Sequence, residues 1–384
     1  MRAIRVVQLV TRLDIGGAQE TVLAYARERD PELVDVSVLA GPVHNFGGSS
    51  WDAATKLSNT AAVRHLVGPV RPFSDLRALV ELYLSFRRTK PDVVHTHSSK
   101  AGFIGRLAAR AAGVPVIVHT VHGWSFRDYQ PRFVSSTYAF LERVVARVTD
   151  VIVVVTPADI DEGLARGIGR PGQYRVVRSG IDLEAFRRSS RDESRRRLGI
   201  SGTTFVWGTV CRLEAPKDVA TLLTAFALDS APARTEILVI IGDGPHRSGL
   251  EGLARELGIR DRVRFEGLRR DVAELLPGFD GFVLSSKSEG MPRVLVEAAA
   301  SGVPIVASRV GGVPEAFGDG EAALLVPPSD VSALHGALVA MRDDKGLRCR
   351  LAENASAVAE RFDSVTMAAE LTRIYEQLIA ARRP

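Results

Sequence analysis

The sequence has 384 residues, which is enough for two domains that each bury a hydrophobic core. Its 46% hydrophobic and 25% charged residues are typical of a globular protein, and two cysteines, Cys211 and Cys349, exclude a disulfide framework or a cysteine zinc site. The 50 Lys and Arg residues against 45 Asp and Glu give a net charge of +5, which suits a phosphate-bearing partner or an anionic membrane surface without requiring either.

Short β-branched segments alternate with helical segments along the whole chain. In the first half, the predicted strands are residues 4–10, 34–40, 93–96, 116–120 and 151–155. In the second half, they are residues 204–210, 237–242, 263–266, 281–285 and 303–307. Gly, Pro or Asp turns and amphipathic stretches follow these strands, a pattern that predicts an α/β fold of parallel sheets covered by helices on both faces.

The first ten residues predict a strand that enters the fold, because they lack the apolar core and the cleavage site of a signal peptide. No uninterrupted apolar run approaches the roughly 18 residues needed to span a bilayer. The sequence therefore predicts a cytoplasmic protein, with association at the inner face of the membrane as an open alternative. The oligomeric state is also left open.

The alternation of strands and helices pauses near residues 182–203, which are rich in Arg and Ser. We place the interdomain connection at 186–202, between a first domain over 1–185 and a second over 203–364, with a C-terminal helix over 365–384. The arginines could bind acidic lipid or nucleic acid, but such a run is more often the solvated face of a short helix.

In the first half, Gly16 and Gly17 end a loop between a strand and a helix. A backbone without side chains can approach a ligand closely there, although a tight turn is the alternative explanation. Asp159-Ile160-Asp161 is similar to a metal-binding DxD motif, but Thr156-Pro157 before it predicts the start of a helix.

Four of the eight histidines lie at the ends of two consecutive predicted strands, at positions His95, His97, His119 and His122. A zinc site there lacks a nearby Cys or an HExxH pattern, so we predict no metal site. Lys100 and Trp124 lie close to these histidines in the sequence. Lys100 could bind a phosphate group and Trp124 the C–H face of a sugar ring, or they belong to the surface and the core respectively.

Two cations follow the predicted strand at 204–210, namely Arg212 and Lys217. Fixed cations at the end of a strand suit a phosphate-bearing ligand, and they would stabilise a leaving group that gains negative charge more in the transition state than in the ground state. Taken alone, an Arg and a Lys in a polar loop are more often ordinary surface residues.

The most informative stretch begins at Ser288, directly after the predicted strand at 281–285. Pro292 suits the first turn of a helix, because the N–H that it lacks would be unpaired there anyway. The N–H groups at the start of such a helix form an anion site beyond the carboxyl end of a strand. Glu289 would lie on the loop and Glu297 on the helix, where it could accept from ribose hydroxyls. A helix-capping acid and an exposed helix residue are the alternatives.

These motifs together resemble family 4 of the retaining glycosyltransferases. Residues 289–297 are similar to its E-x7-E motif, and further segments agree in order and spacing at 16–19, 94–102, 118–124, 208–217, 242–245, 265–267 and 311–315. The resemblance implies a GT-B architecture, in which two Rossmann-like domains with parallel sheets face each other across a cleft. The first would bind the acceptor and the second the nucleotide-sugar donor, and the helix within 365–381 would return to the first domain.

The resemblance also implies roles for single residues. Glu297 would hold the ribose, Glu289 would contact the transferred sugar, and His122 would orient the reacting groups without being a conventional base. The implied catalytic residues are His122, Glu289, Arg212 and Lys217. The implied donor-binding residues are Gly16, Gly17, Arg212, Lys217, Gly290, Met291, Pro292, Arg293, Val294, Leu295 and Glu297.

The sequence therefore predicts a retaining, metal-independent glycosyltransferase that moves a sugar from a nucleoside-diphosphate sugar to a hydroxyl. Among relatives UDP is more common than GDP. The acceptor could be a small molecule, a lipid-linked glycan or a polysaccharide, and we expect no cofactor besides the donor and no nucleic-acid partner. The alternatives are a sugar-nucleotide epimerase, a catalytically silent nucleotide-sugar-binding subunit and a nucleic-acid-binding protein.

Overall fold

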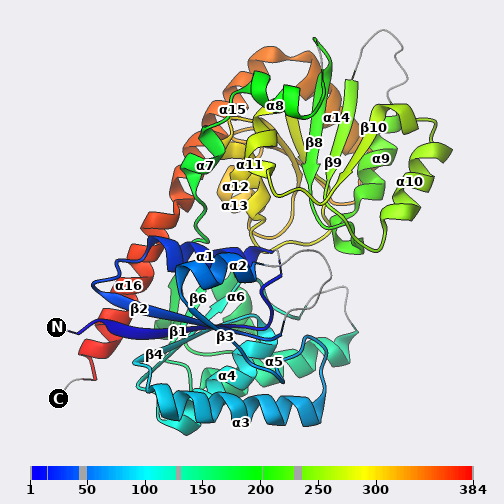
Figure 1. Cartoon of the computed structure of the whole chain (residues 1–384). Coiled ribbons are helices and arrows are strands. Elements are labelled where there is room, and N and C mark those ends of the chain that lie inside the picture. Colours follow the sequence, from blue (N-terminus) through cyan, green and yellow to red (C-terminus); the bar gives the residue numbers. More distant parts are fainter. Residues whose placement is uncertain are drawn as a thin grey trace. The chain divides into compact units, whose positions relative to one another are not determined.

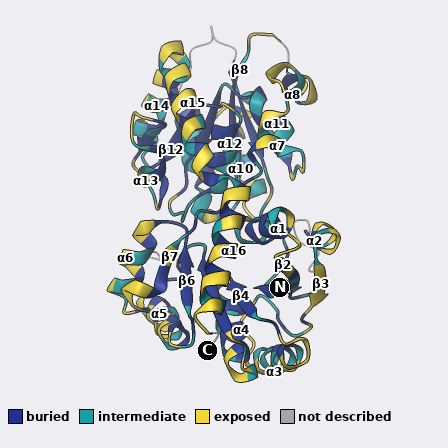
Figure 2. Cartoon of the chain, turned by 90° about the vertical axis from the view of Figure 1, so that its left-hand side faces the viewer, coloured by how far each residue is buried: buried dark blue, intermediate teal, exposed yellow. Residues whose placement is uncertain are grey.

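The computed structural model describes residues 2–14, 16–42, 50–126, 131–200, 202–228 and 236–382. The chain forms two compact units, one comprising Met1–Gly180 and Ser364–Pro384, the other Ile181–Asp363 (Figure 1). Each unit has its own sheet and its own hydrophobic clusters. Apart from the edge strand Asn59–Ala62, the strands of both units are mostly buried or half-buried, and many of the exposed residues lie on the outer faces of the helices (Figure 2).

The first unit is a seven-stranded parallel sheet in the order β3-β2-β1-β4-β5-β6-β7. Its strands are β1 (Ile4–Val10), β2 (Val34–Ala40), β3 (Asn59–Ala62), β4 (Val93–His97), β5 (Val116–Val121), β6 (Val151–Val154) and β7 (Tyr174–Val176). Its main helices are α1 (Gly17–Glu28), α2 (Trp51–Leu57), α3 (Pro72–Thr89), α4 (Ser99–Ala112), α5 (Arg132–Ala146), α6 (Pro157–Ala165) and α16 (Ser364–Ala380).

Helices cover both faces of this sheet because successive side chains of a strand point to opposite faces. Val6 of β1 belongs to the cluster that includes residues of α1 and α16, whereas the next residue, Val7, belongs to the cluster that includes residues of α3 and α4. The C-terminal helix α16 therefore completes the core of the first unit.

The second unit is a six-stranded parallel sheet in the order β10-β9-β8-β11-β12-β13. Its strands are β8 (Phe205–Val210), β9 (Glu236–Ile241), β10 (Val263–Gly267), β11 (Gly281–Leu284), β12 (Ile305–Ser308) and β13 (Leu324–Val326). Its main helices are α7 (Leu183–Arg187), α8 (Arg191–Arg197), α9 (Val219–Ala227), α10 (Arg247–Glu256), α11 (Val272–Leu275), α12 (Arg293–Ala300), α13 (Val313–Phe317), α14 (Val331–Asp343) and α15 (Lys345–Ala359).

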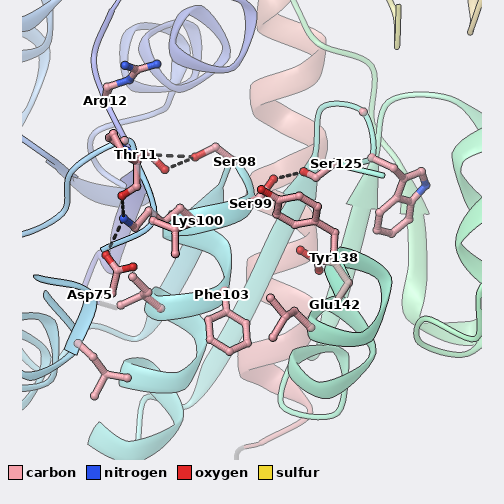
Figure 3. A pocket seen from close by; sticks show the side chains of 18 of the residues that line it. Thr11, Arg12, Asp75, Ser98, Ser99, Lys100, Phe103, Ser125, Tyr138 and Glu142 are labelled. Carbon is pink, nitrogen blue, oxygen red and sulfur yellow. Dashed lines mark hydrogen bonds and ion pairs between the residues drawn. The ribbon is translucent and has the colours of Figure 1, made fainter. Parts of the chain in front are cut away.

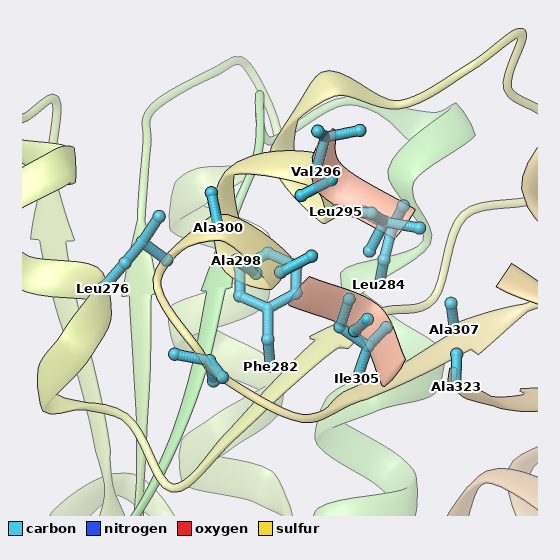
Figure 4. Close-up of a cluster of buried hydrophobic side chains, with 14 of the residues drawn as sticks. Leu276, Phe282, Leu284, Leu295, Val296, Ala298, Ala300, Ile305, Ala307 and Ala323 are labelled. Atoms are coloured by element: carbon cyan, nitrogen blue, oxygen red, sulfur yellow. The ribbon is translucent and has the colours of Figure 1, made fainter. Parts of the chain in front are cut away.

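Helix α12 is anchored to this sheet by its apolar face. Leu295 and Val296 are buried in one cluster with Phe282 of β11 and Ile305 of β12 (Figure 4). Fully burying a side chain of this size contributes about 1.5–3 kcal/mol, so the N-terminal end of α12 is fixed relative to the strands.

The α/β fold class is confirmed, and all ten predicted strands are present within two residues at either end. Sequence reasoning missed β3, β7 and β13, which have four residues or fewer and lie at edges of the two sheets. A short edge strand needs no long apolar run, so β-branched patterning does not reveal it.

The chain passes between the units at residues 180–181 and 363–364, so residues 186–202 lie within the second unit and not between the two. Helix α8 forms there, but its Arg195 is buried and is not part of a solvated face. The Arg195 guanidinium donates to three backbone carbonyls and lies 2.5 Å from Asp280 Oδ2. The exposed Arg191, Arg196 and Arg197 agree with the predicted solvated face, whereas Arg195 has a structural role that composition did not indicate.

Candidate functional site

The sheet of the second unit has a switch point between β8 and β11. The strands that follow β8 in the sequence, β9 and β10, extend the sheet on one side, and those that follow β11, β12 and β13, extend it on the other. Open α/β sheets bind ligands outside the carboxyl ends of the strands at such a point. The loops that follow β8 and β11 contain Arg212, Lys217 and Glu289, which were predicted to bind the donor.

The structure brings Lys217 and Glu289 together. Lys217 Nζ lies 2.5 Å from Glu289 Oε1, and Ser286 Oγ donates to the same oxygen at 2.6 Å. The backbone N–H of Lys287 donates to the carbonyl oxygen of Pro216 at 2.8 Å, which ties the two loops to each other. A cation and a carboxylate from loops 72 residues apart thus share one partly solvated position.

The backbone next to Glu289 is held by a third loop, which follows β12. Gly312 N–H donates to the carbonyl oxygen of Gly290 at 2.7 Å. Gly311 has a φ of +53°, and a Cβ atom there would lie 2.2 Å from the carbonyl oxygen of Glu289. Only glycine combines this backbone conformation with so close an approach, so the loop fixes where Glu289 and the start of α12 lie.

Helix α12 begins at Arg293, with Pro292 in the N-cap position, one residue after the predicted start. Arg293 Nε lies 3.9 Å from Glu297 Oε1, and both side chains are mostly buried. Leu295 is fully buried in the core, and Met291 and Val294 pack against it. The side chains of these three predicted donor-binding residues therefore belong to the core or pack against it, and the Leu295 N–H donates to the carbonyl oxygen of Pro292 at 3.1 Å.

Arg212 is the most solvent-exposed of the predicted site side chains in this unit, with 66% of its side chain exposed and a hydrogen bond to Glu214. Its loop is anchored by close backbone packing. Leu213 N–H donates to the carbonyl oxygen of Asp243 at 3.0 Å, and a Cβ atom at Gly242 would lie 1.9 Å from the carbonyl oxygen of Cys211. The anchored loop leaves the long Arg212 side chain able to reach a ligand.

In the first unit, His122 lies at the end of a chain of hydrogen bonds. His97 Nδ1 is 3.0 Å from His122 Nε2, and His97 Nε2 is 2.6 Å from Gln8 Oε1. Gln8 Nε2 is 3.2 Å from the hydroxyl of Tyr375, which is 2.5 Å from His95 Nδ1. Apart from the half-buried His122, these side chains are all at most 1% exposed.

The amide of Gln8 sets the direction of this chain. Its oxygen can only accept, so His97 donates from Nε2 and, while neutral, accepts at Nδ1. Burial and the neighbouring histidines lower the pKa of His97 well below its ordinary value, which keeps it neutral at pH 7. His122 therefore donates from Nε2, and its neutral form carries the lone pair on Nδ1.

These buried histidines make the first unit sensitive to acid. Burial lowers the pKa of His95 to about 3 and those of His97 and His119 well below 6.5. Because the unfolded chain binds three more protons below about pH 6.5, going from pH 7.5 to 5.5 should remove about 4 kcal/mol from the free energy of unfolding. Amide hydrogen exchange of β4 and β5 at the two pH values measures this change. Equal protection at both, after correction for intrinsic rates, would contradict it.

A pocket of about 1030 Å³ lies at the carboxyl ends of β1, β4 and β5 (Figure 3). The first sheet also switches direction between β1 and β4. The polar lining includes Arg12, Ser98, Ser99 and Lys100, and the apolar lining includes Leu76, Phe103, Tyr138 and Leu141. Sequence reasoning missed most of these residues, because they come from three helices that no single motif connects.

Two residues considered for the acceptor have defined partners in this pocket. Lys100 Nζ lies 2.5 Å from Asp75 Oδ1, which holds the ammonium group at the wall. Trp124 is 3% exposed, donates to the carbonyl oxygen of Asp159 at 2.9 Å and stacks on Phe126. The indole is therefore mainly a core residue that also lines the pocket.

The other predicted features of the first unit are helix starts. Gly16 is the N-cap residue of α1, and Gly17 is its first residue. Thr156 and Asp159 form a capping box at the start of α6, which confirms the helix-start interpretation of the DxD-like sequence. Across the described ranges, no group of three or more His, Cys, Asp or Glu side chains could hold a metal ion.

The two units are Rossmann-like domains of the kind found in GT-B glycosyltransferases. The structure matches Anabaena HepE in complex with UDP and glucose with a TM-score of 0.84, at 22% sequence identity over 97% of this chain and 99% of that chain. It matches sucrose-phosphate synthase from Thermosynechococcus elongatus equally well, at 21% identity over 98% and 100% of the two chains.

The sequence comparisons define the family. Residues 16–180 match a glycosyl transferase 4-like domain, and residues 190–358 match the glycosyl transferases group 1. The UDP-Gal:alpha-D-GlcNAc-diphosphoundecaprenol alpha-1,3-galactosyltransferase of Escherichia coli is 31% identical over 79% of this chain and 80% of its own length. A D-inositol 3-phosphate glycosyltransferase of Saccharomonospora viridis is 32% identical over 96% of this chain and 91% of its own length. The chain belongs to family 4 of the GT-B glycosyltransferases.

Proposed function

We propose that the second unit binds a nucleoside-diphosphate sugar, with UDP preferred to GDP. The observation that carries this proposal is the contact between Lys217 and Glu289 at the switch point, next to the N-terminal end of α12. A cation and exposed helix N–H groups suit a diphosphate, and a carboxylate suits sugar hydroxyls. The choice of nucleotide is supported by two similar proteins, one with a structure in complex with UDP and one named for UDP-Gal as its donor.

The proposed contacts give each predicted site residue one part of the donor. Lys217 and Arg212 bind the diphosphate, and the backbone from Gly290 to Arg293 binds phosphate and sugar hydroxyls. Glu297, one turn into α12, accepts from the ribose, and Glu289 contacts the transferred sugar. For Gly16 and Gly17, at the start of α1 in the first unit, a backbone contact to the donor stays a prediction from the sequence.

We propose that transfer proceeds with retention and without an enzymic nucleophile. The bond between the anomeric carbon and the phosphate oxygen breaks, and its electron pair leaves with the diphosphate. The acceptor oxygen bonds to the same face of the sugar, and its proton passes to the leaving phosphate oxygen. Lys217 and Arg212 stabilise the charge that develops on the diphosphate. The Nε2–H of His122 donates to His97, so His122 orients the reacting groups through Nδ1, which accepts a hydrogen bond while the ring is neutral.

The pocket of the first unit is the proposed acceptor site. Its hydroxyl groups and cations suit the polar part of a hydroxyl-bearing acceptor, and its apolar wall suits sugar C–H faces or a hydrocarbon chain. The two similar enzymes named above act on an inositol phosphate and on a diphosphoundecaprenol-linked sugar according to their names, so both acceptors carry phosphate.

Thermal shift with a panel of UDP- and GDP-sugars tests the donor proposal. A donor present at 100 times its Kd stabilises the protein by about 2.7 kcal/mol, which corresponds to a rise in Tm of roughly 5–10 °C for a domain of this size. The stabilising donor is then incubated with acceptor pools and the products are identified by mass spectrometry. No shift with any donor would overturn the proposal, and a new UDP-sugar formed without acceptor would identify an epimerase.

Turnover is expected to survive EDTA, because Lys217, Arg212 and the start of α12 supply the positive charge that a divalent ion supplies in metal-dependent transferases. The measurement is the initial rate after dialysis against chelator, with and without added Mg²⁺ or Mn²⁺. A rate that disappears in EDTA and returns with either ion would refute metal independence.

The close packing at Gly311 allows a test of the loop geometry. Gly311→Ala forces the Glu289 carbonyl to move, and a shift of about 1 Å at a catalytic group costs up to about 10²-fold in rate. Gly320→Ala is the matched control, because Gly320 also has a positive φ, +73°, but nothing within 4 Å of the added Cβ. We expect both variants to lose some stability and only Gly311→Ala to lose donor turnover. Equal turnover losses would mean that the strain alone is responsible.

A further inference from the structure

An exposed apolar stripe runs along α3. The stripe consists of Phe73, Leu76, Val80 and Leu84, which are 85%, 62%, 47% and 59% exposed. Their spacing of three and four residues places them on one face of the helix, while Ala78, Leu82 and Phe86 on the other face are buried. Single exposed hydrophobic residues are normal, but an aligned set of four indicates an interaction surface.

Basic residues flank this stripe. The exposed ones are Arg71, Arg77, Arg87, Arg88 and Lys90. The acids of the helix are engaged elsewhere, since Asp75 pairs with Lys100 and Glu81 accepts from the backbone N–H groups of Arg64 and His65. The surface around the stripe is therefore cationic, which is complementary to anionic lipid headgroups.

The stripe borders the pocket of the first unit. Leu76 belongs to the stripe and also lines the pocket, and in Figure 3 Asp75 of α3 lies on the opposite side of the pocket from Tyr138 of α5, with Phe103 of α4 between them. Helix α5 has exposed aromatic residues of its own, Phe133 and Phe140. The pocket is thus bounded by two helices that expose large apolar side chains.

We propose that the α3 face binds an anionic lipid bilayer, with the apolar stripe at the level of the acyl chains and the flanking arginines at the headgroups. A second copy of this chain could also cover the stripe, but it would bring two cationic rims together, whereas anionic lipid neutralises them. The consequence for the acceptor rests on the proposed function: a pocket next to the bilayer favours the lipid-linked class.

Vesicle sedimentation with the full chain tests this surface. The protein should sediment with phosphatidylcholine vesicles that contain phosphatidylglycerol, bind pure phosphatidylcholine weakly, and release as salt is raised. The double variant Val80→Ser, Leu84→Ser should weaken binding about tenfold or more. Its matched control is Leu228→Ser, Leu268→Ser, which removes two leucines that are 52% and 45% exposed in the second unit.

Failure of wild-type binding, or an equal loss in the control, would overturn the proposal. A concentration-dependent dimer that the stripe variant abolishes would instead assign the surface to a second copy. The thermal shift with donor needs no vesicles, so it reports separately on whether the proposed donor binding holds.

An independent observation concerns Tyr375 of α16. Its hydroxyl accepts from Gln8 Nε2, and this bond turns the amide so that Gln8 Oε1 faces His97. We propose that Tyr375 is a positioning residue, which acts through Gln8 and His97 to set the tautomer of His122. Only the expected effect on turnover rests on the proposed function of His122. The effect on its tautomer does not, because the tautomer can be observed directly.

Histidine ¹⁵N–¹H long-range NMR correlation of Tyr375→Phe tests this assignment. The wild type should show His122 with its proton on Nε2, and Tyr375→Phe should show a mixture of tautomers, with kcat lowered more than the donor KM is raised. Tyr25→Phe is the control. It removes a buried hydroxyl of α1 that lies 3.1 Å from the hydroxyl of Thr372 on α16 and is not part of the hydrogen-bonded series from Tyr375 to His122. An unchanged His122 spectrum in Tyr375→Phe would refute the role, whatever happens to stability.

Discussion

Lys217→Ala is expected to lower donor turnover by about 10² to 10³-fold, the scale of removing one preorganised electrostatic contact from a transition state. The Lys217 ammonium lies at the switch point of the second sheet, where the leaving diphosphate would gain charge. The residue belongs to a short 3-10 turn, Ala215–Lys217, and a quarter of its side chain is exposed, so the fold should survive the change. Steady-state kinetics together with Tm measures both effects.

Lys287→Ala is the matched control for this prediction. Lys287 lies in the neighbouring loop, is 53% exposed and pairs with Asp218 at 3.3 Å, so its loss should change turnover little. The double variant Lys217→Ala, Glu289→Gln separates two explanations. If Lys217 only neutralises Glu289, the double variant recovers turnover; if each residue contacts the donor, it is at least as impaired as the worse single variant.

Glu289→Gln and Glu297→Gln should fail in different ways. Glu289 is proposed to lie near the anomeric carbon, where positive charge develops, so its neutral analogue should lower kcat by roughly 10²-fold. Glu297 is proposed to hold the ribose, which the reaction leaves unchanged, so its replacement should raise the donor KM more than it lowers kcat. Glutamine keeps the size and one acceptor atom, which isolates the effect of charge.

The comparison requires saturating acceptor and a normal Tm for both variants. The environments support a difference, since Glu289 accepts from Lys217 and Ser286, whereas Glu297 is on α12 with Arg293 3.9 Å away. A reversed pattern would exchange the two roles. Full activity in both variants would remove the assignment of residues 289–297 to the donor.

Much of this molecule could be predicted from local patterns. Alternating β-branched and amphipathic segments were sufficient for ten strands and the α/β class, because burial between two helical layers requires continuous apolar strands. The sequence from Glu289 to Glu297, which covers the end of one strand-to-helix connection and the start of α12, was sufficient to locate a candidate donor site. Thr156-Pro157 likewise predicted the start of α6 correctly, because capping is a contact between near neighbours.

The remaining features depend on contacts between distant parts of the chain. Lys217 meets Glu289 across 72 residues, and Gln8 meets Tyr375 across 367. Arg195 is buried because Asp280 and three carbonyl groups surround it, not because of anything in its own charged run. Sequence periodicity tells which face of a strand or helix is buried but not which elements become neighbours. The strand order and the packing of α16 on the first unit determine which elements are neighbours. They therefore determine which side chains form each site.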